Sequence, residues 1–175
     1  MTMRQFYDWQ TAGGGGDVSL LVATLEKLQI QWCMIGGLAV NHWAEEPMST
    51  ADVDVVIALD RVDEAVKALS EAGFVSERFK WSINLKGHSK VSVQISTEAF
   101  YREFPERAVP ADIHGILMRV ASREDTLSGK LQAYADTQRR PSKRQKDLLD
   151  IARLIENHPE LRSRVPAEIL KKMCE

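Results

Sequence analysis

Apolar residues recur at helical spacing near the start of the chain and then give way to continuous apolar runs. The helical set begins after Asp17, a residue type that often caps helices, and comprises Val18, Leu21, Val22, Leu25 and Leu28. The run 30–35 predicts a buried strand that ends at Gly36-Gly37, and a short helix follows to about residue 43. A second strand is expected over 52–59. The pattern therefore predicts a helix followed by two strands that enclose a short helix.

The remaining pattern continues with strands and ends in helices. Residues 61–72 predict a helix that stops at Gly73. Two strand-like runs, 74–86 and 90–96, meet at a turn-like tetrapeptide and predict a hairpin. A last short strand is expected at 116–120, and helices are expected over 122–136, 142–156 and part of 159–173. This order predicts an α+β fold with a mixed sheet, flanking helices and a helical C-terminal part.

The chain is expected to divide into three parts. Four consecutive glycines, residues 13–16, favour neither helix nor strand, so residues 1–16 are expected to form a loosely attached arm. Residues 17–121 form the predicted α/β core, and residues 122–175 form the helical part packed on it.

Composition restricts the class of protein more than its function. The 175 residues are 44% hydrophobic and 27% charged, which argues against disordered, collagen-like or coiled-coil classes. No apolar run approaches the ~20 residues of a membrane-spanning helix, so no membrane partner is expected. Two distant cysteines, Cys33 and Cys174, favour a cytoplasmic protein without disulfides. The net charge of −2 by itself predicts neither a nucleic-acid binder nor an acidic tail.

The second predicted strand opens with Asp52-Val53-Asp54, and this pair of acids is the strongest chemical signal. In a strand, residues two apart face the same side, so the two carboxylates project together. Two like charges on one face are expected when a cation lies between them, and oxygen ligands suit a hard divalent ion such as Mg²⁺. Asp52 and Asp54 are therefore predicted metal ligands.

The glycine pair between the first strand and the short helix complements these carboxylates. Glycines at such a turn let backbone N–H groups approach an anion, and a helix N-terminus adds about half a positive charge. Gly36 and Gly37 therefore suit a triphosphate. Metal carboxylates facing an anion cradle are typical of phosphoryl or nucleotidyl transfer.

These motifs resemble the signature of the nucleotidyltransferase (DNA polymerase beta-like) superfamily. The resemblance rests on Gly36-Gly37, Thr50 and Asp52-x-Asp54, and on 127–155, which is similar to the helical segment of small prokaryotic members that include abortive-infection-type toxin nucleotidyltransferases. It implies a mixed sheet with packed helices, an NTP donor, Mg²⁺ and a hydroxyl acceptor. It also implies metal binding by Asp52 and Asp54, nucleotide binding by Gly36, Gly37 and Thr50, and a functional pair, Lys130 and Asp147.

Two positions depart from the resemblance. Many relatives carry an arginine two residues before the threonine, where this chain has Met48. Active polymerase-like members also use a third carboxylate on a neighbouring strand, and the matching stretch offers Gln94, whose amide brings no charge. Both departures keep a second hypothesis open, in which the fold is a catalytically weakened nucleotide- or nucleic-acid-binding module and part of a toxin–antitoxin-like pair.

Several residues also have simple structural interpretations. For Thr50 the alternatives are an ordinary strand residue and a hydroxyl at the rim of the site. For Lys130 they are a side chain that extends along an apolar helix face and one that binds phosphate. For Asp147 they are a member of a surface ion pair and a functional group. Five bases in residues 139–146 form a solvated loop or meet a nucleic-acid backbone. Trp81 and the other tryptophans are expected to make core or arm contacts.

The first hypothesis is thus a Mg²⁺-dependent enzyme that moves an NMP from an NTP to a hydroxyl of RNA, protein or a small molecule. A cognate partner protein is compatible with either hypothesis. The sequence leaves the nucleotide, the acceptor and the oligomeric state open.

Overall fold

The computed structural model describes residues 14–50, 52–113 and 115–174. Residues 1–13, most of the predicted arm, lie outside the described residues. Helix α2, Gly15–Lys27, begins at Gly15 with Gly14 as its N-cap. The expected cap, Asp17, instead lies in the first turn, where its buried carboxylate accepts hydrogen bonds from the backbone N–H groups of His88 and Ser89. These bonds tie the helix to the loop of a distant hairpin.

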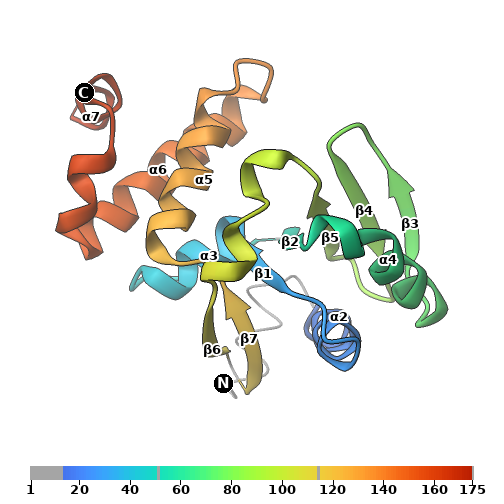
Figure 1. Cartoon of the computed structure of the whole chain (residues 1–175). Coiled ribbons are helices and arrows are strands. Elements are labelled where there is room, and N and C mark those ends of the chain that lie inside the picture. Colours follow the sequence, from blue (N-terminus) through green and yellow to red (C-terminus); the bar gives the residue numbers. More distant parts are fainter. Residues whose placement is uncertain (1–13, 51, 114, 175) are drawn as a thin grey trace.

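A seven-stranded mixed sheet forms the centre of the fold, in the order β3-β4-β5-β2-β1-β7-β6 (Figure 1). Strand β2 pairs antiparallel with β1 and parallel with β5. This arrangement confirms the predicted α+β class. The strands are β1 Trp32–Ile35, β2 Asp52–Ile57, β3 Val75–Arg78, β4 Ser82–Lys86, β5 Ser92–Ser96, β6 Val109–Ile113 and β7 Ile116–Val120.

One strand prediction was wrong, and one strand was not predicted. The run 74–86 forms two antiparallel strands, β3 and β4, because the chain turns between Phe79 and Ser82, where the N–H of Phe79 bonds the carbonyl of Ser82. That turn contains no Gly, Pro, Asn or Asp to reveal it. Strand β6 contains Pro110, a residue type that weakens a strand pattern, and it lies at the sheet edge, where proline is tolerated. The predicted β4–β5 hairpin is confirmed.

One face of the sheet packs on two helices and holds the main core. Val53 and Val55 of β2 are buried on this face together with side chains of β4 and β5. Helices α2 and α4, Val62–Glu71, cover it with apolar stripes that include Leu21, Leu25 and Leu69. Their burial follows from the alternation that sends every second strand residue to this side.

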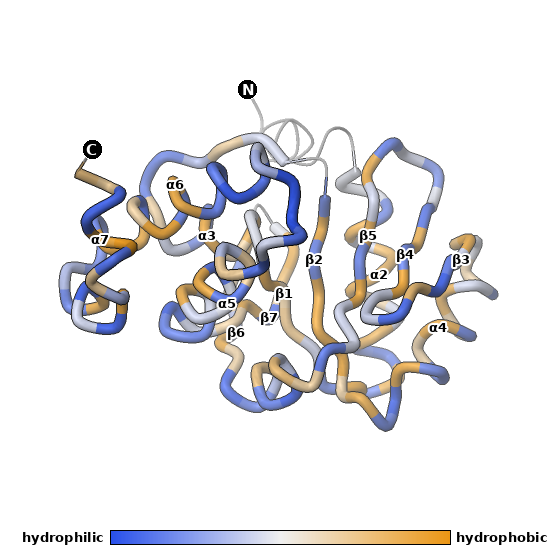
Figure 2. The backbone as a smooth tube through the Cα atoms, turned by 90° about the horizontal axis from the view of Figure 1, so that it is seen from above, coloured by the Kyte–Doolittle hydropathy of each residue, from blue (hydrophilic) through white to orange (hydrophobic). Residues whose placement is uncertain are grey.

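The helical C-terminal part has a core of its own. It consists of α5 Arg123–Ala135, α6 Pro141–Asn157, η4 Pro159–Arg164 and α7 Ala167–Met173, and it packs with α3 Gly36–Trp43. Val40, Leu127, Ile151 and Leu154 are buried in this second cluster. Figures 1 and 2 show these helices gathered at one end of the molecule and β3, β4 and α4 at the other. Strand β2 lies between the two ends.

Two short 3-10 turns close part of the second sheet face. They are η2 Ala99–Tyr101 and η3 Phe104–Arg107, and their Tyr101 and Phe104 pack with Cys33 and Val56 of the sheet. Beyond this small cluster the face becomes polar, starting with the acids of β2. None of the described helices combines the length and apolarity needed to cross a membrane.

Candidate active site

Asp52 and Asp54 project from the same face of β2, as the alternation predicted. Both residues are partly exposed, whereas Val53 between them and Val55 after them are buried on the other face. Asp54 lies in register with Ile35 of β1 on one side and Gln94 of β5 on the other. The two carboxylates therefore sit side by side at the point where the sheet meets α3.

Gly36 holds the turn from β1 into α3 directly against Asp54. Its φ of 68° lies in the left-handed region that favours glycine. A Cβ atom at this position would overlap Oδ2 of Asp54. The backbone turn and the carboxylate therefore touch, which brings the predicted anion cradle and the predicted metal ligand into one site.

Asp54 has no hydrogen-bond or ion-pair partner among the residues that the structure describes. Burial raises the pKa of its carboxyl, and the charge of Asp52 raises it further, against the opposing effect of Lys130, Lys143 and Arg139. A carboxylate that is largely buried and has no partner is costly unless a cation compensates it. Its environment thus fits a group that binds a cation.

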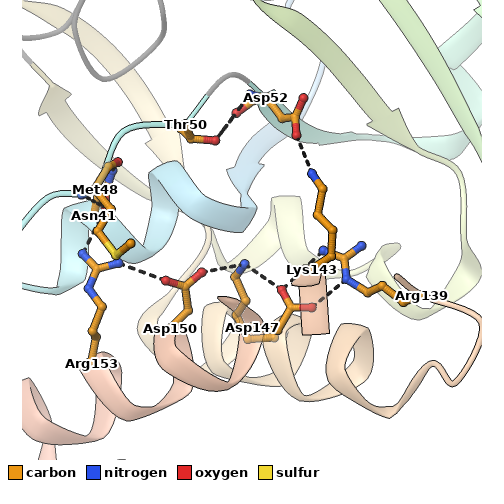
Figure 3. Close-up of polar contacts among 10 residues, drawn as sticks. Asn41, Met48, Thr50, Asp52, Arg139, Lys143, Asp147, Asp150 and Arg153 are labelled. Carbon is orange, nitrogen blue, oxygen red and sulfur yellow. Dashed lines mark hydrogen bonds and ion pairs between the residues drawn. The ribbon is translucent and has the colours of Figure 1, made fainter. Parts of the chain in front are cut away.

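Asp52 is paired with a lysine from the start of α6. The Nζ of Lys143 lies 2.9 Å from Oδ2 of Asp52, and both side chains are 41% exposed (Figure 3). An ion pair with this exposure is weak, because water screens it. Lys143 therefore neutralises Asp52 in a contact that an incoming cation can replace.

A chain of ion pairs links α5 and α6 behind the carboxylates. Lys130 contacts Asp147 at 3.1 Å and Asp150 at 2.8 Å. Asp147 also accepts from Arg139 at 2.6 Å, and Asp150 pairs with Arg153 at 2.9 Å (Figure 3). The side chains of Lys130, Asp147 and Asp150 are at most 9% exposed. Lys130 and Asp147, predicted as a functional pair, are thus in direct contact.

The charge of Lys130 is maintained by its acidic partners. Burial alone would lower the pKa of its ammonium group, but Asp150 and Asp147 outweigh that effect and the pKa is raised. The cation therefore persists at neutral pH beside Asp54. Because both partners are almost fully buried, removal of either one would leave an uncompensated charge between α5 and α6.

The segment that leads into β2 is held by side chains on either side of it. The Thr50 hydroxyl is buried and exchanges hydrogen bonds with the backbone of Asp52, at 3.2 and 3.3 Å. Asn41 of α3 bonds both the N–H and the carbonyl of Met48, and the guanidinium of Arg153 donates to Asn41 and to the Glu46 carbonyl. Thr50 thus fixes the backbone of Asp52 at the start of β2.

Lys146 points toward the glycine turn. A Cβ atom on Gly37 would lie 3.6 Å from Oγ1 of Thr50 and 3.9 Å from Nζ of Lys146. No described residue forms an ion pair or hydrogen bond with the Lys146 ammonium. Lys130 and Lys143, in contrast, are each bound to carboxylates. Lys146 thus supplies a positive charge beside Gly37.

A pocket of about 200 Å³ opens beside Asp54. Its lining includes Lys130 and Arg139, and also Gln94, Glu98 and Tyr101. Trp81 lies at the pocket and is 56% exposed, so it is not a core residue; the alternative of a contact with the arm concerns residues that lie mostly outside the described ranges. Gly36 and Asp54 border the same pocket, which connects the glycine turn to a space for a substrate.

Sequence reasoning missed several of these residues. Three of them, Arg139, Lys143 and Lys146, belong to the basic run in residues 139–146. The sequence showed this run of positive charges but not which of its side chains point toward the site. The helical spacing of α6 turns part of that run toward β2. Glu98 and Tyr101 gave no signal, because only the turn after β5 brings them to the pocket.

A mixed sheet that carries two carboxylates on one strand, opposite a glycine turn into a helix, defines a nucleotidyltransferase fold. A family model described as nucleotidyl transferase AbiEii toxin, type IV TA system, matches residues 19–175. The chain belongs to this family, which confirms the resemblance seen in its motifs. No curated protein matches the chain.

Solved structures share the fold. An antigenic nucleotidyltransferase-like protein from Paracoccidioides brasiliensis is 23% identical, with a TM-score of 0.55 over 81% of this chain and 74% of that chain. The lincosamide antibiotic adenylyltransferase LnuA, bound to lincomycin, is 11% identical, with a TM-score of 0.56 over 79% of this chain and 96% of that chain. ANT(2")-Ia in complex with adenylyl-2"-tobramycin is 15% identical, with a TM-score of 0.57 over 85% of this chain and 98% of that chain. At these identities the likeness establishes the fold.

Proposed function

We propose that the protein is a Mg²⁺-dependent nucleotidyltransferase that moves an NMP from an NTP to a hydroxyl of RNA, protein or a small molecule. The observation that carries the proposal is the contact between the Gly36 turn and the unpartnered carboxylate of Asp54. Family membership supports NMP transfer in general.

The donor set fits a Mg²⁺ ion. Within the described ranges, no group of three or more His, Cys, Asp or Glu side chains could hold a metal. Mg²⁺ does not need such a cage, because it commonly binds through one or two carboxylates together with substrate phosphates. Asp52 and Asp54 would supply those carboxylates. When bound there, the cation would neutralise α-phosphate charge and lower the pKa of the attacking hydroxyl.

The surrounding residues would bind and orient the triphosphate. The N–H groups at Gly36 and Gly37 would meet the β- and γ-phosphates at the positive end of α3. Lys146 would add the cation that Met48 does not provide. Lys130 would steady negative charge near Asp54, and Asp147 would hold the Lys130 ammonium in place.

Transfer assays test this proposal directly. Purified protein would be incubated with Mg²⁺, each α-³²P-labelled NTP and three acceptors: total RNA, the protein itself and tobramycin. We expect label transfer by the wild type, its loss in Asp52→Asn and Asp54→Asn, and its retention in Asp60→Asn, an exposed acid away from the site. No transfer to any acceptor by the wild type would overturn the proposal.

Gln94 and Met48 favour a second candidate, a nucleotide- or nucleic-acid-binding module without turnover. Calorimetry with Mg²⁺ and a non-hydrolysable NTP separates the two. Binding without pyrophosphate release from ordinary NTPs supports the module, whereas binding with release supports the enzyme. The family description names a toxin of a type IV TA system, so a cognate antitoxin is the partner we propose for either form. A cytoplasmic location also stays a proposal.

A further inference from the structure

We propose that Glu98 is the catalytic residue that accepts the proton of the attacking hydroxyl, in place of a carboxylate at Gln94. The inference rests on the proposed function, since it concerns the acceptor side of the same reaction. Gln94 lies next to Asp54 in register, on the parallel neighbour of β2, and its amide cannot take a proton from a hydroxyl.

Four carboxylates, including that of Asp54, line the pocket. Two of them are in ion pairs and two are not. Asp125 is bound to Arg107 at 2.9 Å, and Asp147 is bound to Lys130 and Arg139. Glu98 and Asp54 have no hydrogen-bond or ion-pair partner for their carboxylates within residues 14–50, 52–113 and 115–174. A carboxylate that is already bound to an arginine or lysine is a poor base. Of the two unpaired carboxylates, Asp54 faces the glycine turn, which leaves Glu98 for proton transfer.

The position of Glu98 follows from the end of strand β5. Ser96 is the last residue of that strand, and η2 begins at Ala99, so the chain bends at Glu98. The N–H of Thr97 bonds the carbonyl of Trp81, which fixes this bend to the start of β4. Glu98 is partly buried and borders the pocket together with Gln94 and Ser96. Glu98 thus borders the pocket from the bend after β5, four residues beyond Gln94 in the chain.

Tyr101 provides independent support for a shared space between Glu98 and Asp54. Burial raises the pKa of the Tyr101 phenol, and the charges of Glu98 and Asp54 raise it further. Both carboxylates therefore act on the same phenol, which lines the pocket between the sheet and α5. The phenol has no hydrogen-bond partner among the described residues. An acceptor hydroxyl placed there would find both a base and a second polar group.

The proposed step balances without a further reactant. The O–H bond of the acceptor breaks and its proton moves to the Glu98 carboxylate. The freed oxygen forms a bond to the α-phosphorus of the NTP, while the bond from that phosphorus to the bridging oxygen breaks and pyrophosphate leaves. The products are the nucleotidylated acceptor, pyrophosphate and a protonated Glu98, which returns its proton to water.

The test compares Glu98→Gln with wild type, using the acceptor that supports wild-type transfer in the panel of total RNA, the protein itself and tobramycin. Loss of a general base is expected to lower kcat by about 100-fold or more. The Kd for Mg²⁺ and a non-hydrolysable NTP should stay within twofold, because the proposal assigns Glu98 to the acceptor hydroxyl and not to the donor. Glu106→Gln, an exposed acid on η3, is the matched control and should behave as wild type.

Chemical rescue separates a base from a structural group. Added formate should restore part of kcat to Glu98→Ala, and Glu98→Asp should retain partial activity. If the wild type transfers label but Glu98→Gln keeps kcat within threefold, the inference fails and the proposed function stands. It also fails if the NTP Kd weakens in parallel with kcat, or if formate restores nothing. No transfer by the wild type to any acceptor overturns the proposed function and the inference together.

Discussion

Gly36 and Asp54 are 18 positions apart in the sequence, yet a Cβ atom on the glycine would overlap the Asp54 carboxylate. Gly36 also has a φ of 68°, a backbone angle that residues with a Cβ atom rarely adopt. The turn between β1 and α3 therefore depends on glycine for two separate reasons, and both concern the candidate active site.

Substitution of Gly36 should damage activity more than its effect on stability suggests. We expect Gly36→Ala to destabilise the fold by about 1–2 kcal/mol, from left-handed strain and displacement of Asp54, and to reduce transfer at least about 100-fold. Chemical denaturation and the labelled-NTP assay measure the two effects. Gly16→Ala, on α2 with open space around it, is the control and should be neutral or slightly stabilising. A Gly36→Ala variant with wild-type transfer would contradict this prediction.

Removing the charge of Asp54 should stabilise the protein in the absence of metal. The folded-state pKa is raised above its ordinary value of 3.8, so the ionised carboxylate destabilises the fold at neutral pH. We expect Asp54→Asn in EDTA to raise Tm by about 2–4 °C at pH 7, equivalent to about 1 kcal/mol in a chain of this length. The gain should vanish near pH 3, where the carboxyl is protonated in both folded and unfolded states.

Metal addition provides the complementary measurement. A ligand that binds only the folded state raises Tm, so millimolar Mg²⁺ should stabilise the wild type and Asp60→Asn but leave Asp54→Asn unchanged. Equal stabilisation of all three proteins would argue against a cation at Asp54.

Lys146 should contribute to nucleotide binding rather than to folding. Without a bound anion, its ammonium lies at the positive end of α3, an unfavourable position for a cation. Lys146→Met is therefore expected to leave Tm unchanged or slightly raised and to weaken the Kd of a non-hydrolysable NTP about tenfold, or ~1.4 kcal/mol. Calorimetry measures this Kd, with Lys67→Met on the exposed side of α4 as control. An unchanged Kd would exclude Lys146 from the triphosphate site.

Asp147 should affect stability strongly. Asp147→Asn leaves Lys130 with one carboxylate partner and leaves Arg139 without an ion-pair partner among the described residues. Lys130 and Asp147 are nearly inaccessible to water. Breaking a buried ion pair from one side typically costs about 3–5 kcal/mol. Urea denaturation should therefore show a loss of this order, against little change for Glu156→Gln at the exposed side of α6. Activity of Asp147→Asn is to be compared with its measured stability, because unfolding alone would also abolish transfer.

The sequence alone determined the features that depend on local spacing. Alternation in β2 placed Asp52 and Asp54 on one face, and glycine chemistry placed a turn at Gly36-Gly37. Helical periodicity located α2, α4, α5 and α6 within a few residues. These features follow from the backbone geometry of single elements, so they can be inferred from neighbouring residues.

Tertiary structure decided which of these elements face one another. The sequence showed five positive charges in the basic run but not which way they point, and only the packing of α6 on α5 and α3 brought Lys143 to Asp52 and Lys146 to Gly37. The bend after β5 likewise brought Glu98 to the pocket of Asp54. Contacts between residues far apart in the chain depend on how whole helices and sheets pack, and a pattern read along one segment carries no information about that packing.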